Sequence, residues 1–315
     1  MSLIFDKETG LLAGGVIAVL ILASLIGWVL ARRPGNAGYQ ETIANLNART
    51  RAWWLMVAIF FLAMLSGESA RSSYSDSHSF LALREFITMT PTKRGDHDTL
   101  LWLFFVITPI QYGLVAIGWY GLFAIFIPVY AFLFVPLRSV LSGDCEHFLE
   151  RTATMQWALM ICVYCVSHAP ALLTLEIPGF EGQNGKLLFY FVLVVQASDV
   201  LQYIWGKLLG KHKIAPTVSP NKTWEGFLGG VATATLLGTA LWWATPFTPW
   251  QAAGMSLAIT LMGFVGGLVM SAIKRDRGVK DYGTLIQGHG GVMDRIDSLC
   301  FSAPVFFHLT RYFFT

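Results

Sequence analysis

The densest group of residues that could do chemistry occupies positions 271–297 and reads SAIKRDRGVKDYGTLIQGHGGVMDRID. Its four carboxylates and five cations lie between two long apolar segments. Asp294 and Asp297 are three residues apart, so on a helix they would share one face. Carboxylates so placed commonly hold Mg²⁺, whose remaining ligands are phosphate oxygens and water. The pattern therefore predicts a site for Mg²⁺ and a polyphosphate. The cations that this anion needs would be Lys274, Arg275 and Lys280.

The glycine-rich turn at 288–291 supports the same interpretation. Its glycines carry no Cβ atom, so backbone N–H groups on either side of His289 can approach an anion closely. A plainer alternative is a basic loop on the cytoplasmic side of a membrane, in which acids only balance bases. That alternative explains the Lys and Arg residues, but it does not explain the acids, bases and glycines together. We therefore expect a ligand site here.

A second polar group reads SPNKTWEG at 219–226 and places a short turn in front of a helix. Its hydrogen-bond donors gather before the helix N-terminus, where backbone N–H groups already favour an anion. These donors are Ser219, Asn221, Lys222 and Thr223. Such turns are common, so this group is weak evidence by itself. It gains weight because it should lie on the same side of the membrane as the first group.

An aspartate inside an apolar segment is the third feature. Asp199 would cost about 2.5–3.5 kcal/mol to insert into a membrane, so a functional role is the first hypothesis. Gln196, Asp199 and Gln202 with Tyr203 follow a three-to-four spacing, which predicts one polar stripe facing the protein interior. The helix ends at a loop rich in Lys, so the stripe would lead from the bilayer to the basic face. A helix–helix hydrogen bond is the structural alternative.

The composition indicates which elements must position these residues. The 315 residues are 55% hydrophobic and only 13% charged, against about 25% charged in an average soluble domain. Such a chain cannot cover a globule with polar surface, which excludes both a soluble multidomain protein and a disordered one. We expect an all-α, polytopic bundle of integral membrane helices in a lipid bilayer. The net charge of +3 is too small to indicate nucleic acid binding.

Nine apolar segments are predicted to form membrane helices. They lie at 10–31, 52–66, 100–118, 122–136, 155–174, 187–203, 227–244, 252–270 and 299–314. The uncharged stretch 100–136 is divided at 118–121, because Gly-Trp-Tyr-Gly suits a turn at the membrane interface. The first segment is predicted to be a retained anchor rather than a cleaved signal peptide.

The distribution of Lys and Arg predicts the orientation of these helices. The segments 206–224 and 272–297 contain nine of the 22 basic residues and should both be cytoplasmic, like the segment after the first helix. With the segment after the first helix inside, nine crossings would place the two later basic segments outside. A tenth crossing at 77–90, short or irregular and shielded by protein, restores the parity and places both termini outside. An amphipathic helix lying on the interface is the alternative. The prediction is nine to ten transmembrane helices.

These patterns together resemble the phosphatidate cytidylyltransferase (CDP-diacylglycerol synthase) family. Its signature is matched by Ser271-x-x-Lys274-Arg275, Lys280-Asp281-x-Gly283 and His289-Gly290-Gly291-x-x-Asp294-Arg295-x-Asp297. The 219–226 segment and Asp199-x-x-x-Tyr203-x-x-Gly206 extend the likeness from about residue 187 to the C-terminus. The N-terminal half matches more loosely, through Arg84-Glu85-Phe86 and its hydrophobic pattern. The chain departs from the family at Gln287, where Pro or Gly is usual.

The resemblance implies transfer of the cytidylyl group of CTP to phosphatidate, which gives CDP-diacylglycerol and pyrophosphate. It implies Mg²⁺ held by Asp281, Asp294 and Asp297. The cations for the triphosphate and the leaving pyrophosphate would be Lys274, Arg275, Lys280 and Arg295. The residues that position phosphate groups would be Ser219, Lys222 and Ser271. Asp199 would line the entry of the lipid phosphate, and the loop that shapes the site or touches the nucleotide would contain His289, Gly290 and Gly291.

The chain is accordingly predicted to have three parts. These are an anchor helix and linker at 1–51, membrane helices at 52–186 and a catalytic region at 187–315. The expected location is the bacterial inner membrane, with the active site on the cytoplasmic face. Two other functions stay open, namely an anion transporter or channel and a cytidylyltransferase for another lipid phosphate. A homodimer also stays open.

Overall fold

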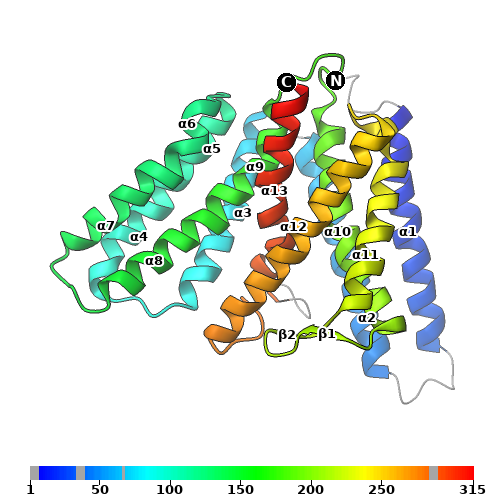
Figure 1. Ribbon diagram of the computed structural model, residues 1–315, viewed down its shortest axis with the longest axis horizontal. Helices are drawn as coiled ribbons and strands as arrows, with labels where there is room; N and C mark the ends of the chain where they lie inside the picture. The colour runs from blue at the N-terminus through cyan, green and yellow to red at the C-terminus, as the bar shows by residue number, and fades with distance from the viewer. Residues whose placement is uncertain (1–6, 33–39, 66–67, 284–289) are drawn as a thin grey trace.

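The computed structural model describes residues 7–32, 40–65, 68–283 and 290–315 and shows a helical bundle with one small hairpin (Figure 1). The long continuous helices are α1 (Lys7–Arg32), α2 (Gln40–Leu65), α3 (Glu68–Thr88), α10 (Asn184–Leu209), α11 (Trp224–Ala240), α12 (Pro249–Asp276) and α13 (Met293–Phe314). A short η7 (Trp242–Ala244) follows α11. The predicted all-α bundle is confirmed, and the first predicted segment is the helix α1.

Between α3 and α10 the chain forms three composite rods, each with a π-helical segment in its middle. The first contains η2 (Arg94–Asp96), α4 (His97–Trp102), η3 (Leu103–Ile107) and α5 (Thr108–Ala116). The second contains α6 (Tyr120–Ile125), η4 (Phe126–Ala131) and α7 (Phe132–Val140). The third contains α8 (Phe148–Leu159), η5 (Met160–Cys165), α9 (Val166–Ala171) and η6 (Leu172–Thr174). The chain turns between the first two rods at Gly118, whose φ of +68° suits glycine. The predicted break at 118–121 is confirmed.

Six helices or rods are long and apolar enough to cross a membrane, and they make this an integral membrane protein. They are Lys7–Arg32, Arg94–Ala116, Tyr120–Val140, Phe148–Thr174, Asn184–Leu208 and Pro249–Asp276. Within the described residues, α2, α3, α11 and α13 do not meet this criterion. The helix α11, for example, has only 17 residues. Length and composition therefore support six spans rather than the nine to ten expected.

The segment 77–90 belongs to α3, which is a continuous helix of 21 residues. Its buried side chains form one stripe along the helix. They are Ser79, Ala82, Leu83, Phe86 and Ile87. This stripe packs against α5, η5 and α9, so it faces protein and not a membrane interface. The expected shielding by protein is confirmed. The helix is unbroken and does not meet the criterion for a membrane span, so a short or irregular crossing at 77–90 stays a prediction.

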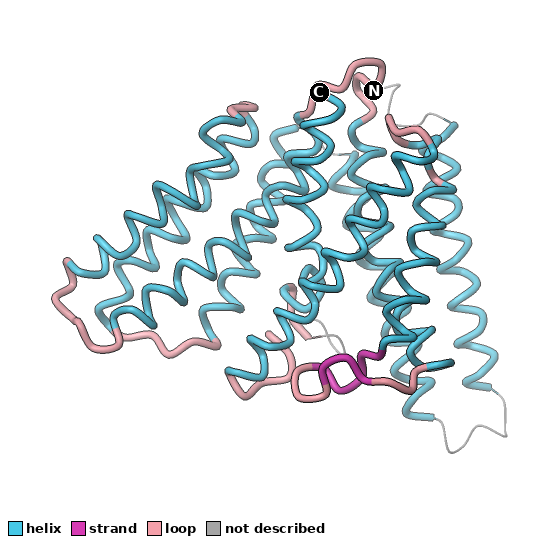
Figure 2. Tube along the Cα trace, in the orientation of Figure 1, coloured by secondary structure: helices cyan, strands magenta, loops and turns pink. Residues whose placement is uncertain are grey.

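The two ends of the bundle differ. Figure 1 and Figure 2 show α1 beginning and α13 ending at one end, while the hairpin lies at the other end beside the last turns of α12. The strands β1 (Lys213–Ala215) and β2 (Ser219–Thr223) pair antiparallel. The sequence indicated only a turn here. Thr223 then caps α11, because its Oγ1 accepts a hydrogen bond from the Gly226 backbone N–H at 3.2 Å.

Glycines bring α10, α11, α12 and α13 close together. A Cβ atom at Gly226 would lie 2.8 Å from the Gln202 carbonyl oxygen and 2.9 Å from the Cα atom of Gly206. A Cβ atom at Gly266 of α12 would lie 2.8 Å from the Asp297 carbonyl oxygen of α13. Membrane helices commonly gain close packing through such small residues. The contacts join α11 closely to α10 and α12 closely to α13.

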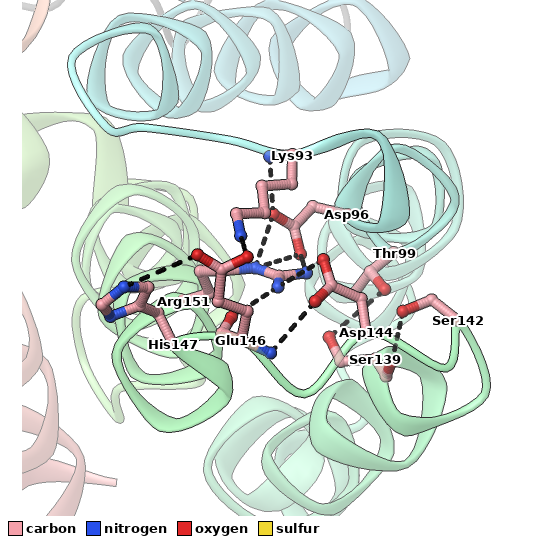
Figure 3. Close-up of polar contacts among 9 residues, drawn as sticks. All are labelled: Lys93, Asp96, Thr99, Ser139, Ser142, Asp144, Glu146, His147 and Arg151. Atoms are coloured by element: carbon pink, nitrogen blue, oxygen red, sulfur yellow. Dashed lines mark hydrogen bonds and ion pairs between the residues drawn. The ribbon is translucent and has the colours of Figure 1, made fainter.

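A separate charged network holds the rods together at the same end of the bundle (Figure 3). Arg151 Nε donates to both carboxylate oxygens of Asp96 at 3.0 Å, and Nη2 donates to Oδ1 at 2.6 Å. Its Nη1 donates to Asp144 Oδ2 at 2.9 Å and to the Glu146 carbonyl oxygen at 2.8 Å. Lys93 pairs with the Glu146 carboxylate. We call these five residues the Arg151 network. It ties the loop after α3 to the loop between α7 and α8.

Candidate functional site

The three polar groups singled out in the sequence meet at the hairpin end of the bundle. Arg275, in the last turn of α12, donates from Nε to the Val218 carbonyl oxygen in the hairpin at 3.3 Å. Lys222 of β2 reaches back along α12, since a Cβ atom at Gly267 would lie 2.9 Å from its Nζ. The two basic segments therefore lie on one side of the bundle, as the sequence predicted.

An ion pair between α12 and α13 forms the centre of the first group. Lys274 Nζ lies 2.9 Å from Asp294 Oδ1, and the two side chains are only 12% and 7% exposed. The other carboxylate oxygen, Oδ2, accepts hydrogen bonds from the backbone N–H groups of Tyr282 at 2.7 Å and Gly291 at 3.0 Å. The carboxylate of Asp294 thus holds both ends of the 282–291 loop against α13.

The glycine turn lies directly on this carboxylate. Gly290 has a φ of +77°, and a Cβ atom there would lie 2.4 Å from Asp294 Oδ2. The same Cβ atom would lie 3.3 Å from the Cβ atom of Asp281, whose side chain is exposed. Glycine is therefore required at 290 for both conformation and space. The close approach of backbone to an anion was predicted, and the anion in contact here is the chain's own Asp294.

A second group, which we call the Asp199 group, joins Asp199, Lys222, Asp297 and Ser298. Ser298 donates to Asp297 Oδ1 from its backbone N–H at 2.8 Å and from its hydroxyl at 3.4 Å, and the charges of Asp297 and Lys222 act on Asp199. Lys222 Nζ lies 4.5 Å from the centroid of the Phe264 ring. Burial lowers the pKa of the Lys222 ammonium, while the charges of Asp199 and Asp297 act to raise it. The group thus combines one cation with two acids at the base of the hairpin.

The two groups belong to one electrostatic site. Asp297 interacts with the charges of Lys274, Lys222 and Asp294. Lys222 in turn interacts with Lys274 as well as with the acids of its own group. A ligand that brings several negative charges to this place would meet both lysines together. The structure therefore brings the predicted residues of α10, α12 and α13 together, and their role as one site stays a prediction.

The polar stripe on α10 is only partly as predicted. Gln196 Nε2 donates to the Arg295 carbonyl oxygen of α13 at 3.2 Å, so this end of the stripe faces the interior. Gln202 Nε2 donates to Ser198 Oγ on its own helix at 2.8 Å. The Tyr203 side chain is 57% exposed and does not belong to an interior stripe. Its position, one residue past Gln202 on the helix, turns the ring outward.

Several predicted site residues lie at the edge of this centre. Ser271 Oγ donates to the Gly267 carbonyl oxygen of its own helix at 2.7 Å. Ser219 is half-buried in β2, opposite Ala215. The Lys280 side chain is exposed, like that of Asp281. His289 and Gln287 lie outside the described residues.

The donor chemistry beside Gly290 fits Mg²⁺. Carboxylate oxygens are the hard ligands that this ion prefers, and it needs only one or two of them when phosphate oxygens and water complete its shell. Asp281 and Asp294 both lie against Gly290. Across residues 7–32, 40–65, 68–283 and 290–315, no three His, Cys, Asp or Glu side chains are gathered for a metal ion. The pair that would hold Mg²⁺ is thus Asp281 with Asp294, while Asp297 belongs to the Asp199 group.

The sequence reasoning gave no role to Glu85, which lies in the site. Its carboxylate, on α3, accepts hydrogen bonds from the backbone N–H groups of Val292 and Met293 at 2.9 Å each. The neighbouring Phe86 ring stacks on Tyr282, with ring centroids 6.2 Å apart. The signal that could have found Glu85 was its place in the Arg84-Glu85-Phe86 match, but the sequence did not indicate which element this segment would reach.

Comparison with known proteins now defines the class. The profile of the cytidylyltransferase family matches residues 47–313, and the chain belongs to that family. The chain is 40% identical over 301 residues to uncharacterized protein YnbB of Escherichia coli K12, covering 94% of this chain and 96% of the relative. It is 29% identical over 268 residues to the phosphatidate cytidylyltransferase of Staphylococcus aureus COL, covering 82% and 97%. It is 48% identical over 171 residues to that of Mycobacterium leprae TN, covering 53% of each chain.

Proposed function

We propose that this protein transfers the cytidylyl group of CTP to phosphatidate, giving CDP-diacylglycerol and pyrophosphate for phospholipid synthesis. One observation carries the proposal. The three segments that resemble the family pattern, far apart in the sequence, meet at one end of the bundle around Lys274, Asp294 and the Asp199 group. The family membership and the names of two relatives support the same reaction.

The reaction needs positioning and charge stabilisation more than a strong base. A phosphate oxygen of phosphatidate is already an anion, so it attacks the α-phosphorus of CTP directly. A new P–O bond forms, the bond from the α-phosphorus to the bridging oxygen breaks, and pyrophosphate leaves with that electron pair. The charge on the triphosphate and on the leaving group would be neutralised by Lys274, Arg275, Lys280 and Arg295. A fixed arrangement of cations favours this charge because it needs little reorganisation during the reaction.

The lipid phosphate would approach from the bilayer side of the site. Asp199 lies in α10, and Lys222 enters the same group from the hairpin. The half-buried ammonium of Lys222 would supply the positive charge that a phosphate monoester needs in this group. Ser219 and Ser271 lie on the hairpin and on α12 and would position phosphate groups from the rim. The loop with His289, Gly290 and Gly291 would shape the site or touch the nucleotide.

We infer that Mg²⁺ is the metal of the reaction, held by Asp281 and Asp294, with Asp297 behind them. When bound, the ion would neutralise phosphate oxygens and orient the triphosphate. Lys274 would then exchange its contact with Asp294 for one with phosphate. The support is the Asp294 carboxylate and the Asp281 Cβ atom, which both lie beside Gly290, and the contact of Lys274 with Asp294.

The membrane placement is part of the proposal. The hairpin end, with its basic segments, would face the cytoplasm of a bacterial inner membrane, where CTP is available. Ten crossings would bring both chain ends to the outer side. An even number of crossings, six as well as ten, is supported by α1 beginning and α13 ending at the end opposite the hairpin (Figure 1). The division into 1–51, 52–186 and a catalytic 187–315 remains a prediction.

Purified protein in detergent, given radiolabelled CTP, Mg²⁺ and phosphatidate, tests the reaction. We expect a CTP-dependent liponucleotide and equimolar pyrophosphate. A transporter or channel would form neither. The same assay with an isoprenoid phosphate or another lipid phosphate decides the acceptor, because the better acceptor gives the larger kcat/KM. Light scattering on the same sample decides between a monomer and a homodimer.

A further inference from the structure

The contact between Glu85 and α13 joins two helices that are far apart in the sequence. Glu85 Oε1 accepts a hydrogen bond from Val292 N–H and Oε2 accepts one from Met293 N–H, both at 2.9 Å. These donors lie at the beginning of α13, where backbone N–H groups have no partner inside the helix and the helix dipole favours a negative charge. The carboxylate of Glu85 therefore acts as a cap supplied by another helix.

Glycines on both sides of the loop make room for this carboxylate. A Cβ atom at Gly291 would lie 2.2 Å from Glu85 Oε2, and one at Gly283 would lie 3.0 Å from Glu85 Oε1. No side chain at Gly291 could coexist with the observed position of the carboxylate. Two glycines of the family signature are thus explained by Glu85 rather than by the ligand alone.

Glu85 and Asp294 accept hydrogen bonds from different backbone N–H groups at the beginning of α13 and in the loop before it. Asp294 takes the N–H groups of Tyr282 and Gly291, and Glu85 takes those of the next two residues, Val292 and Met293. Moving either carboxylate would therefore move the turn that the other one holds. Since Asp294 is also the partner of Lys274, the position of Glu85 reaches the centre of the site.

A second contact of α3 holds the same loop. The Phe86 ring stacks on Tyr282, and the Tyr282 hydroxyl donates to the Met270 carbonyl oxygen of α12 at 3.0 Å. Phe86 and Tyr282 are both almost fully buried. The helix α3 thus fixes the loop near its beginning through Phe86 and at its end through Glu85. A helix that only closed the bundle would need neither contact.

We propose that Glu85 is a positioning residue of the cytidylyl-transfer site. It fixes the N-terminus of α13, and through it Asp294, in the orientation that receives the nucleotide and its metal. The inference rests on the proposed function and adds to it a residue from the half of the chain that lies outside the predicted catalytic region.

The test compares Glu85→Gln and Glu85→Asp with Glu181→Gln in the full-length protein in detergent. Glu181 is a matched control, because its carboxylate also accepts a backbone N–H, that of Gly179, in a turn outside the site. The Gln amide can accept from one of the two N–H groups but presents its own NH₂ to the other.

For Glu85→Gln we expect kcat to fall about tenfold or more and the Mg²⁺ concentration for half-maximal rate to rise. Amide hydrogen exchange in 291–295 should also become faster. Glu85→Asp keeps the charge and should recover part of the activity, while Glu181→Gln should change none of these.

A purely structural cap would lower the melting temperature of Glu85→Gln and leave kcat and the Mg²⁺ dependence at wild-type values, which would overturn the proposal. Unchanged hydrogen exchange in 291–295 would overturn it as well. The failure of the proposed function looks different, since wild-type protein would then form no liponucleotide. In that case the increase in melting temperature on adding Mg²⁺ and CTP decides the role of Glu85. A smaller increase in Glu85→Gln than in wild type supports it, and an equal or absent increase overturns it.

Discussion

In the Arg151 network each cation contacts a carboxylate directly, whereas in the Asp199 group Lys222 does not. Arg151 and Asp96 are 7% and 3% exposed and share three hydrogen bonds. Lys222 is half-buried, yet among the described residues it forms no direct ion pair with Asp199 or Asp297. The hairpin and the two loops that the Arg151 network joins lie at the same end of the bundle (Figure 1).

The difference indicates what each set of charges is for. Burying a charge is costly unless hydrogen bonds and an opposite charge compensate it, and the Arg151 network supplies both. Its guanidinium fork is matched to carboxylates and leaves little capacity for a ligand. A compact ammonium such as that of Lys222, held at longer range by two acids, keeps capacity for phosphate. We therefore assign the first group to the fold and the second to the site, and four predictions test this division. They run from the largest expected effect on turnover to the smallest.

Asp294→Asn should abolish turnover while the protein remains folded and membrane-inserted. The amide has nearly the shape of the carboxylate, so its oxygen can still accept from Tyr282 and Gly291 N–H groups, but it loses the charge that Lys274 and Mg²⁺ require. Liponucleotide formation and the melting temperature in detergent are measured together. Near-normal activity at saturating Mg²⁺ would remove Asp294 from the metal site.

Asp199→Asn should lower turnover at least about tenfold, equivalent to about 1.4 kcal/mol in the activation barrier. The melting temperature should be unchanged or higher, because an Asn amide can still form a hydrogen bond between helices and such interhelical hydrogen bonds average only about 0.6 kcal/mol. Wild-type kcat/KM for phosphatidate with a reduced melting temperature would make Asp199 structural. The site would then consist of the hairpin and the 271–297 segment only.

Asp96→Asn should show the opposite pattern. Removing the charge of Asp96 leaves the buried guanidinium of Arg151 short of a partner, a change that typically costs about 3–5 kcal/mol of stability. The melting temperature should fall clearly, while kcat of the protein that remains folded should stay within about twofold of wild type. A tenfold loss of kcat at a temperature where the variant is fully folded would mean that the network acts on the site.

Cysteine substitutions at Lys213 and Arg277 should leave turnover unchanged to within about twofold and report only on orientation. Cys145 is exposed at the same end of the bundle, so a Cys145→Ser background avoids its labelling. In intact cells an impermeant maleimide added from outside should label neither position. In permeabilised cells the same reagent should label both. Labelling from outside would reverse the proposed topology and place the basic segments away from CTP.

The sequence was sufficient to predict the helices and the convergence of the three polar groups. Long apolar segments and the split at Gly118 are local signals, and the basic segments indicated which helix ends share a side. The contact between Lys274 and Asp294 follows from α12 and α13 being consecutive antiparallel helices, so it too could be anticipated from spacing.

The remaining features depend on contacts between distant segments. The hairpin has only three-residue and five-residue strands, too short to show a periodic pattern. The outward position of Tyr203 depends on how α10 is rotated against its neighbours. Glu85 contacts Val292 and Met293, which follow it in the sequence by 207 and 208 positions. In addition, α3 carries too many polar residues to be recognised from its sequence as an interior helix. No local pattern encodes such contacts.

The passage of Lys222 beside Gly267 has a consequence for how this sequence can evolve. A methyl group at 267 would lie 2.9 Å from the lysine Nζ, so the ammonium at the end of the flexible side chain would have to move away from α12. A lineage that gained Ala or Ser at 267 could keep its cation, but the charge would stand in a slightly different place. The residue at 267 therefore sets where the charge of the residue at 222 lies, although the two positions are 45 apart in the sequence.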